Sequence, residues 1–342
     1  MKTGSETITA VIATLNEARH IRGCIEGLLA QTGVNLVEVL VVDGGSQDGT
    51  PEIVQRLPEF GTKVFLLRNP KRFQVYAWNI GIAAARGQYT AFFIGHARYA
   101  PDYLRQCLEA RKRTGAANVG GVQVPAYDGG ACAPAIAWAM SSRFGVGGAN
   151  LRYAREECFV DSVFCGFYET SLLRDLGGFD ERIPFDEDDD LNYRVRKAGH
   201  KVLVSPRIRV SYYVRSSLSG LAKQMFRYGF WRRATQLKHP DLVPWRILVP
   251  PLFVVALCAS ALALVLRNPL GLVVPLAYLA FCAAALFEAY TRLRSSRALL
   301  APVVLSVMHV SYGVGYLFGL FGLRGSTFRS EFANRFSLQR PS

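Results

Sequence analysis

The chain has 342 residues, half of them apolar, and carries 40 Lys and Arg against 26 Asp and Glu, a formal charge of +14 at pH 7. This length allows a large hydrophobic core and one or two domains. The composition excludes a disordered chain, a collagen-like repeat and a small disulfide scaffold.

The N-terminal part of the chain alternates between short β-branched runs and helical patterns. Strands are predicted at residues 8–14, 37–43, 64–68 and 89–94, and helices at 17–31, 50–57 and 73–86. This alternation predicts an α/β domain with a mostly parallel sheet flanked by helices. Ligands of such sheets bind outside the carboxyl ends of the strands, so the residues that follow each strand are the first candidates for a binding site.

An acid ends the second predicted strand, in the segment Asp43-Gly-Gly-Ser-Gln-Asp-Gly-Thr50. The segment is neither a P-loop, because it lacks G-K-[ST], nor the G-x-G-x-x-G fingerprint. A carboxylate here can accept a hydrogen bond from a base N–H or a ribose hydroxyl. An Asx-type turn that caps the helix beginning at Thr50 explains the same pattern equally well.

Five adjacent acids, Asp186 to Asp190, precede a helical pattern over residues 191–199. Favourable interaction with the helix dipole explains one or two of them. Five neighbouring carboxylates repel one another and raise some of their pKa values, as acid–base sites do. A general base is therefore expected among them, although composition does not show which residue it is.

Three long uncharged runs, at 247–266, 270–287 and 298–323, lie in the C-terminal part. About 20 apolar residues span a bilayer core as a helix, so we predict three transmembrane helices. In the third run, Gly315, Gly319 and Gly322 have the spacing that lets helices pack closely in lipid.

The charges give a partial orientation. The N-terminus has no signal-peptide pattern, which predicts that the first 246 residues stay in the cytoplasm. Cations cluster just before the first run, as the positive-inside rule expects: Lys223, Arg227, Arg232, Arg233, Lys238 and Arg246. Three crossings would place the tail arginines 324, 329, 335 and 340 on the opposite side, against the same rule, so a re-entrant run is the alternative.

Aromatic and cationic side chains mix in residues 224–233, next to the first apolar run. This pattern is typical of an interfacial helix with aromatics at headgroup level and Arg on phosphates, and it is compatible with an anionic lipid substrate. Because the positive charge gathers beside the membrane runs, nucleic-acid binding is not expected.

Several motifs occur together in order: T-L-N-E at 14–17, V-D-G-G-S-x-D-G-T at 42–50, N-x-G at 79–81 with R-G at 86–87, and E-D-x-D-L at 187–191. Together they resemble a family 2 glycosyltransferase of the GT-A fold. Segments 68–72, 95–104, 144–149, 177–182 and 227–232 are similar to the succinoglycan-biosynthesis ExoA-like branch of membrane-attached bacterial transferases.

The resemblance implies an inverting transfer of a sugar, usually from a UDP-sugar, to a lipid-linked saccharide or polyprenyl carrier in exopolysaccharide or cell-surface glycan synthesis. It places the enzyme at the bacterial inner membrane, with its catalytic domain on the cytoplasmic side and other polysaccharide assembly proteins as partners. The expected organisation is a GT-A domain at 1–220, an interfacial segment at 221–246, membrane helices at 247–323 and a basic tail at 324–342.

The resemblance also assigns roles to residues. It makes Asp188 the general base, with Glu187 and Asp189 orienting it or holding the acceptor. The implied nucleotide-binding residues are Thr14, Asn16, Glu17, Asp43, Ser46, Arg72 and Asn79. The implied contacts to the leaving group or acceptor are Gln224, Arg227 and Trp231, in a segment similar to the Q-x-x-R-W element of processive relatives, with Tyr228 in place of Trp.

The chain departs from the family at the fourth strand. The family normally places D-x-D there, or D-A-H in this branch, to hold Mg²⁺ or Mn²⁺ on the diphosphate, whereas this chain has Ile94-Gly95-His96. Three alternatives stay open: His96 and the diphosphate hold the metal weakly; Lys71, Arg72 or Arg227 replace it; or the protein has lost catalysis and acts as a scaffold in a polysaccharide assembly complex.

Overall fold

The computed structural model describes residues 6–147, 154–241 and 245–322, and they form two compact units. Unit 1 comprises Met1–Asp128 and Gly148–Val214, and unit 2 comprises Gly129–Gly147 and Arg215–Ser342. The expected catalytic domain at 1–220 differs from this division mainly in residues 129–147. These residues group with the C-terminal helices because they include an eight-residue apolar helix, α5 (Ala133–Met140), in which every residue is buried.

Unit 1 is built on a nine-stranded mixed sheet with the order β3-β2-β1-β4-β8-β6-β9-β5, and β7 also pairs with β9. The strands are β1 (Thr7–Thr14), β2 (Asn35–Asp43), β3 (Val64–Arg68), β4 (Tyr89–Ile94), β5 (Ala97–Tyr99), β6 (Asn118–Ala126), β7 (Cys158–Phe159), β8 (Phe167–Glu169) and β9 (Val202–Tyr213). The helices are α1 (Ile21–Leu29), α2 (Thr50–Gln55), α3 (Gln74–Ala84), α4 (Tyr103–Thr114), α7 (Thr170–Asp175) and α8 (Glu187–Lys197).

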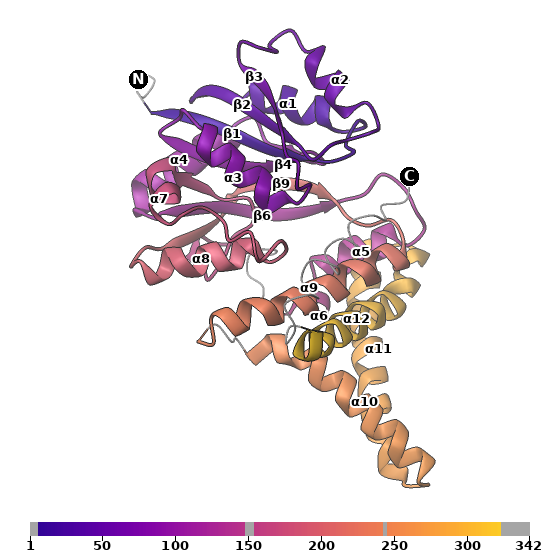
Figure 1. The fold of residues 1–342 in the computed structure, drawn as a ribbon. Helices are drawn as coiled ribbons and strands as arrows, with labels where there is room; N and C mark the ends of the chain where they lie inside the picture. The colour runs from indigo at the N-terminus through magenta and orange to yellow at the C-terminus, as the bar shows by residue number, and fades with distance from the viewer. Residues whose placement is uncertain (1–5, 148–153, 242–244, 323–342) are drawn as a thin grey trace. The chain divides into compact units, whose positions relative to one another are not determined.

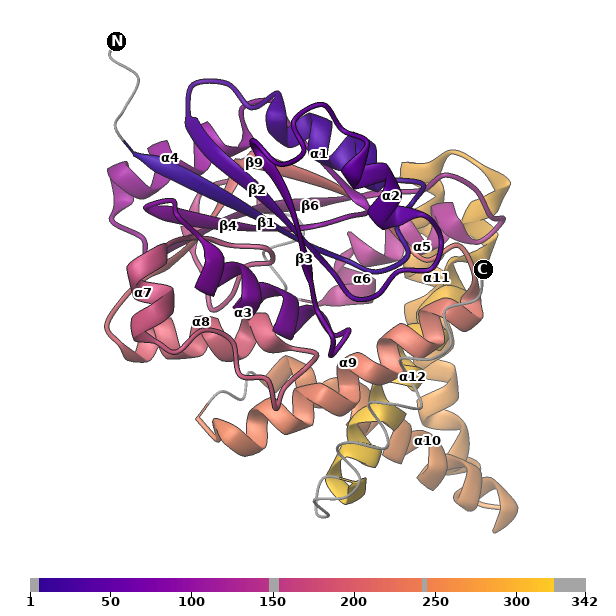
Figure 2. The same ribbon diagram turned by 45° about the horizontal axis from the view of Figure 1, so that its top comes forward.

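The first four strands form the parallel half of the sheet, as the alternating pattern predicted. β1 pairs in parallel with β2 and β4, and β2 pairs in parallel with β3. Their β-branched and aliphatic side chains are largely buried, because helices cover both faces. Figure 2 shows α3, α7 and α8 on one face and α1 and α4 on the other.

The second half of the sheet is less parallel than the sequence suggested. β8 is antiparallel to both β4 and β6, and β5 is antiparallel to β9. Strands of three residues carry no detectable periodicity, so β5 and β8 could not be predicted.

A buried carboxylate, paired with an exposed guanidinium, joins β1, β2 and the segment after α3. Glu38 is 1% exposed, and its carboxylate accepts hydrogen bonds from Thr9 Oγ1 and Arg86 Nε, each at 2.7 Å. The Arg86 backbone N–H donates to the same carboxylate. Because a buried carboxylate is stable only when its charge is compensated, the Arg-Gly pair at 86–87 has a structural role in the packing of α3 on the sheet.

The register aligns the ends of the parallel strands. Thr14 lies opposite Asp43, Asp43 opposite Arg68, and Ala13 opposite Ile94. The loops that follow β1, β2, β3 and β4 therefore leave the sheet at one edge, which is where such sheets bind ligands.

Unit 2 is helical, and its elements are coloured magenta, orange and yellow in Figure 1. The helices are α5, α6 (Arg143–Val146), α9 (Leu218–Lys238), η2 (Trp245–Leu248), α10 (Val249–Val265), η3 (Pro269–Leu272), α11 (Val273–Leu293), η4 (Ser296–Leu300) and α12 (Ala301–Gly322). Three helical stretches, Trp245–Val265, Pro269–Leu293 and Ser296–Leu320, are long and apolar enough to cross a membrane.

Close packing of α9 on α12 depends on glycine. A Cβ at Gly229 would collide with the Tyr312 carbonyl oxygen, and a Cβ at Gly315 would collide with that of Phe226. At Gly319 a Cβ would lie 3.0 Å from the Phe230 carbonyl oxygen. Gly315 and Gly319 thus serve the packing role predicted for them. The surroundings of Gly322 lie outside the described residues.

We predict that Gly315→Ala destabilises unit 2 by about 1–3 kcal/mol, because the added methyl group must push α9 and α12 apart. The measurement is the midpoint of thermal unfolding of the detergent-solubilised protein. Gly27→Ala is the matched control, since a Cβ at this position of α1 meets no atom within 4 Å. An equal midpoint for Gly315→Ala and wild type would contradict the packing described here.

Candidate active site

The loop after β2 is organised by Asp43. Its carboxylate accepts hydrogen bonds from the backbone N–H groups of Gly45 and Ser46, at 2.8 and 3.0 Å, and from Ser46 Oγ at 2.5 Å. These bonds form an Asx turn that folds Gly44 and Gly45 over the strand end, whereas the first helical N–H at Thr50 is bonded by Asp48. Asp43 therefore makes the expected turn, but the side chain that accepts the Thr50 N–H at the start of α2 is Asp48. The expected bond from Asp43 to a base or ribose stays a prediction.

The loops after β1 and β2 are tied to each other. The backbone N–H groups of Asn16, Glu17 and Ala18 donate to Ser46 Oγ, Thr50 Oγ1 and Asp48 Oδ2, respectively. The Asn16 side-chain oxygen accepts the Gln47 N–H at 2.9 Å. Asn16 has a φ of 56°, a conformation that Asn tolerates better than most residues, and this explains why the helix begins only at Ile21.

Glu17 and His96 form a pair between the loops after β1 and β4. Glu17 is 8% exposed, and its Oε1 lies 2.8 Å from His96 Nδ1. Gly95 permits this approach, because a Cβ there would lie 3.0 Å from Glu17 Cγ. A carboxylate on Nδ1 fixes the orientation of the ring and directs Nε2 away from the pair.

Two further side chains complete this edge. The hydroxyl of Thr14 is buried and has no hydrogen-bond partner in the structure. The side chain of Ile94 is also buried, at 6% exposed, and it belongs to the hydrophobic core of unit 1. The edge therefore offers an unpaired hydroxyl and an oriented imidazole, but no carboxylate at position 94.

The loop after β3 presents a cation. Asn69 is buried and holds the turn by donating to the Phe73 carbonyl oxygen and accepting the Lys71 N–H. Arg72 has a φ of 65°, and its carbonyl oxygen would lie 3.1 Å from a Cβ at Gly44. Gly44 therefore allows the Arg72 backbone to sit against the Asp43 turn, and the exposed guanidinium has no protein partner among the described residues.

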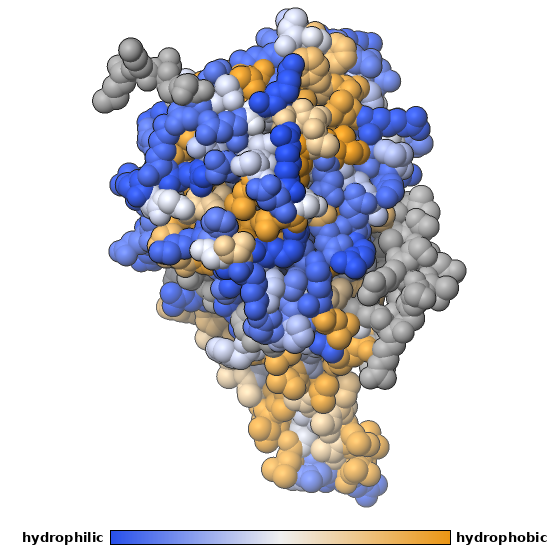
Figure 3. All heavy atoms as spheres, turned by 60° about the vertical axis from the view of Figure 1, so that its left-hand side comes forward, coloured by the Kyte–Doolittle hydropathy of each residue, from blue (hydrophilic) through white to orange (hydrophobic). Residues whose placement is uncertain are grey.

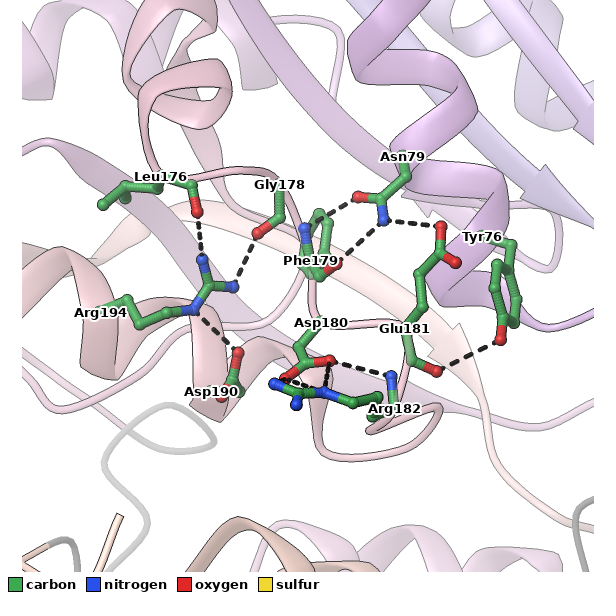
Figure 4. A network of polar contacts seen from close by, with 10 residues as sticks. All are labelled: Tyr76, Asn79, Leu176, Gly178, Phe179, Asp180, Glu181, Arg182, Asp190 and Arg194. Atoms are coloured by element: carbon green, nitrogen blue, oxygen red, sulfur yellow. Dashed lines mark hydrogen bonds and ion pairs between the residues drawn. The ribbon is translucent and has the colours of Figure 1, made fainter. Parts of the chain in front are cut away.

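The five acids at 186–190 divide into different roles. Asp190 is fully buried and lies 3.0 Å from Arg194 Nε. The same guanidinium donates to the carbonyl oxygens of Leu176 and Gly178, each at 2.7 Å (Figure 4). Asp190 is therefore structural, and it anchors the first turn of α8 to the loop that precedes it.

Asn79 holds the same loop from the other side. Its side-chain amide accepts the Phe179 N–H at 2.8 Å and donates to the Phe179 carbonyl oxygen at 2.9 Å, with a further contact to Glu181 (Figure 4). Gly178 has a φ of 70°, and a Cβ there would lie 2.6 Å from Asn79 Oδ1. Both ends of the amide are thus used within the fold, and the expected contact of Asn79 with the nucleotide stays a prediction.

Glu187 connects the acids to the edge of the sheet. Its Oε1 accepts a hydrogen bond from Gln74 Nε2 at 3.0 Å, and Gln74 is the first residue of α3, directly after the loop that carries Arg72. Phe73 and Phe185 also meet edge to face, with ring centroids 6.0 Å apart. The first turn of α8 therefore lies beside the loop after β3, although the two segments are far apart in sequence.

Asp188 is the acid with an available carboxylate. It is half-buried, and none of the described residues donates a hydrogen bond to it. Burial, followed by the charges of Glu187, Asp189 and Asp186, raises the pKa of its carboxyl well above the ordinary value. An unpaired carboxylate with a raised pKa is suited to accept a proton at neutral pH.

The remaining expected residues lie in unit 2, on α9. Gln224 Nε2 donates to Tyr228 Oη at 3.0 Å, and Arg227 Nε donates to the Lys223 carbonyl oxygen at 3.4 Å. Trp231 is 2% exposed and packs edge-on against Phe230. The indole therefore packs inside unit 2, and its expected contact with the leaving group or acceptor stays a prediction.

Comparison with known proteins identifies the family of the chain. The family model described as "Glycosyl transferase family 2" matches residues 9–177. The succinoglycan biosynthesis protein ExoA of Rhizobium meliloti is 31% identical over 308 residues, which cover 90% of this chain and 92% of that protein. The chain belongs to glycosyltransferase family 2.

Two more proteins, one matched by sequence and one by structure, are similar to this glycosyltransferase. A Methanococcus voltae enzyme named as a dolichyl N-acetylglucosaminyl phosphate diacetamido-dideoxyglucuronosyltransferase is 31% identical over 231 residues, covering 65% of this chain and 71% of that enzyme. The mannosyltransferase PcManGT from Pyrobaculum calidifontis, solved with GDP-Man and Mn²⁺, superposes with a TM-score of 0.57 at 19% identity, covering 92% of this chain and 87% of that one. This likeness confirms the predicted GT-A fold.

The family 2 transferase also contains positioning residues that sequence reasoning missed. Arg194 was recognisable only as a partner four residues after Asp190, a spacing that also occurs in ordinary surface pairs. Gln74 carried no signal at all, because nothing in the sequence relates it to Glu187. Asp48 was part of a recognised motif, but its bonds to Thr50 and Ala18 required the loop geometry.

The pH dependence of stability tests the environment of Glu187. Burial raises the pKa of this carboxyl from 4.5 to about 7. Below pH 4.5 both the folded and the unfolded state bind the proton. Between pH 4.5 and 7 the unfolded state releases it first, so the free energy of unfolding falls by about 3 kcal/mol as pH rises.

We predict that Glu187→Gln removes most of this fall, so that its unfolding midpoint matches wild type at pH 4.5 and exceeds it at pH 8. Asp188 contributes in the same direction and leaves a residual slope. Glu52→Gln, at an exposed position of α2, is the control and keeps the wild-type profile. Parallel profiles for Glu187→Gln and wild type would contradict the assignment.

Proposed function

We propose that this glycosyltransferase moves a sugar from a UDP-sugar to a lipid-linked saccharide or polyprenyl carrier, with inversion at the anomeric carbon, in exopolysaccharide or cell-surface glycan synthesis. One observation carries the proposal: in unit 1, the unpaired carboxylate of Asp188 lies on a helix end tied by Glu187 and Gln74 to the loop after β3. The names of the relatives, in succinoglycan synthesis and in transfer to a dolichyl-linked acceptor, support the acceptor class.

The nucleotide is assigned to the edge formed by the loops after β1, β2 and β3. The Asp43 carboxylate already accepts three hydrogen bonds, and it retains lone-pair capacity for one donor from the base or ribose. Thr14, Asn16, Glu17 and Ser46 line the same edge, although the Asn16 and Ser46 side chains are used to hold the loops. The exposed guanidinium of Arg72 is suited to the diphosphate.

Asp188 is assigned as the general base. The acceptor hydroxyl oxygen attacks C1 of the donor sugar while the bond from C1 to the diphosphate oxygen breaks on the opposite face. The hydroxyl proton passes to Asp188, and the nucleoside diphosphate leaves with the bonding electron pair. Glu187, held by Gln74, and Asp189 supply the neighbouring charges that keep the proton affinity of Asp188 high.

The family implies a divalent metal on the diphosphate, and the edge offers a reduced but fitting donor set. His96 presents Nε2 because Glu17 engages Nδ1, and the unpaired Thr14 hydroxyl lies near Gly95. The described residues contain no group of three or more His, Cys, Asp or Glu side chains suited to a metal ion. His96 would therefore hold the ion together with diphosphate oxygens, and an imidazole favours Mn²⁺ over Mg²⁺. When bound, the ion would neutralise charge on the departing diphosphate.

The catalytic assignment predicts that Asp188→Asn lowers the rate constant for sugar transfer by about 10²–10⁴-fold while the affinity for UDP stays within a factor of two. The measurements are transfer from a panel of UDP- and GDP-sugars to a lipid-linked acceptor, and calorimetric titration with UDP and GDP. Asp175→Asn, at an exposed acid of α7, is the control and keeps full activity.

Retained transfer by Asp188→Asn would contradict the base assignment. Tighter binding of GDP than of UDP by the wild-type protein would contradict the donor class. Nucleotide binding with no transfer from any donor of the panel would favour the scaffold over the enzyme.

The metal assignment predicts that Mn²⁺ tightens UDP binding by the wild-type protein and that His96→Ala abolishes this gain. Glu17→Gln should lower the apparent Mn²⁺ affinity by about 10–100-fold, because the ring loses its orienting carboxylate. The readout is calorimetric titration of UDP with and without Mn²⁺, so it does not depend on turnover. If Mn²⁺ leaves wild-type UDP binding unchanged, the metal assignment is wrong, and the alternative in which Lys71, Arg72 or Arg227 replaces the metal is favoured.

A further inference from the structure

Two helices of unit 2 project beyond the rest. α10 and α11 form a hairpin whose turn contains Arg267 and Asn268. They pack along their lengths: the rings of Phe253 and Tyr278 lie 4.4 Å apart, and a Cβ at Gly271 would lie 2.6 Å from the Ser260 carbonyl oxygen. Figure 1 shows the tip of this hairpin extending past the other helices of the unit.

The hairpin has the length and surface of two membrane crossings. Trp245–Val265 comprises 21 residues. At 1.5 Å per residue this spans about 31 Å, close to the thickness of a bilayer core. Its outward side chains are large and apolar, including Leu252, Leu262, Leu279 and Phe287. Figure 3 shows this hydrophobic surface with hydrophilic atoms at its end.

The third apolar helix, α12, has different neighbours. His309 Nε2 lies 3.0 Å from the Phe144 carbonyl oxygen of α6. A Cβ at Gly313 would meet the Pro250 carbonyl oxygen, in the first turn of α10. The middle of α12 thus lies at the start of the hairpin and not beside its tip.

The second half of α12 packs on α9. The glycine contacts join Gly315 to Phe226 and Gly319 to Phe230 and Arg233. Tyr316 Oη also donates to Gln236 Oε1 at 2.5 Å. From Gly315 to Gly319, α12 therefore contacts α9, which precedes the first crossing in the chain. His309 and Gly313 contact the hairpin itself, through Tyr278 and Pro250.

The charges of α9 indicate on which side of the bilayer the second half of α12 lies. α9 follows directly after unit 1 and carries five cations: Lys223, Arg227, Arg232, Arg233 and Lys238. A helix with this many cations does not enter the hydrocarbon core, where each charge is strongly disfavoured. Because the second half of α12 lies directly on α9, it cannot run to the opposite face of the membrane.

We propose that the chain crosses the membrane twice, through α10 and α11, and that α12 lies with α9 against the face on which unit 1 is attached. The chain after residue 322 then returns to the side of unit 1. This arrangement removes the conflict in the charge pattern, since the tail arginines 324, 329, 335 and 340 join the cations of α9 on one side.

Cysteine labelling of the full chain in intact cells tests this topology. Cysteines are introduced one at a time, as Ser219→Cys on α9, Asn268→Cys in the hairpin turn and Ser342→Cys at the C-terminus. The background replaces the exposed Cys258 and the half-buried Cys132 and Cys158 by Ala. A membrane-impermeant maleimide is applied before and after permeabilisation, which reports every accessible cysteine.

The expected result is that Ser342→Cys behaves like Ser219→Cys, with less than about one tenth of the labelling in intact cells, whereas Asn268→Cys is labelled fully. Three crossings would place the C-terminus with the turn, so equal labelling of Ser342→Cys and Asn268→Cys would overturn the proposal. Protection of all three positions in intact cells would also overturn it, because the hairpin then does not cross. The outcome is independent of sugar transfer.

Discussion

The ion pair between Asp190 and Arg194 determines where the acids of the first turn of α8 lie. Asp190 is fully buried, and the same Arg194 guanidinium binds the carbonyl oxygens of Leu176 and Gly178. Asn79 of α3 holds the next residue, Phe179, by both backbone groups. The loop between α7 and α8 is thus fixed from two helices, and the first turn of α8 has one position relative to the sheet. Breaking such a buried pair by removing one partner leaves an uncompensated charge, so the site depends on a contact that takes no part in catalysis.

Much of the fold could be predicted from the sequence, because it rests on local patterns. The alternation of β-branched runs and helical spacing located β1 to β4 and their helices, and β3 and β4 were predicted with their observed bounds. The short antiparallel strands escaped detection since three residues carry no periodicity. The segment 129–147 escaped as well, because its grouping with the C-terminal helices depends on contacts such as that of Ser142 with Glu288, which are distant in sequence.

The types of residue in the candidate site could be predicted from the sequence, but the role of each residue could not. The resemblance placed seven residues near the nucleotide and three acids at the base, and it could not separate those that bind ligand from those that hold the loops. Asn79 and Trp231 use their polar or aromatic groups within the fold. Asp188 and Asp190 are two positions apart on α8, so their side chains point in different directions. Asp190 is buried and paired with Arg194, whereas Asp188 is unpaired. These differences depend on the direction in which each side chain points, and the spacing of residues in the sequence does not determine that direction.

At the end of β4, the chain has a buried Ile94 where the family places a carboxylate, and a Glu17–His96 pair beside it. A carboxylate at position 94 would be almost fully enclosed among core side chains, and it would require a bound cation to compensate its desolvation. An isoleucine there adds about 1.5–3 kcal/mol of hydrophobic stabilisation instead. The carboxylate at this edge then comes from Glu17, whose Oε1 lies 2.8 Å from His96 Nδ1. The Ile94 side chain therefore belongs to the core of unit 1, and Glu17 with His96 supplies the polar groups at this strand end.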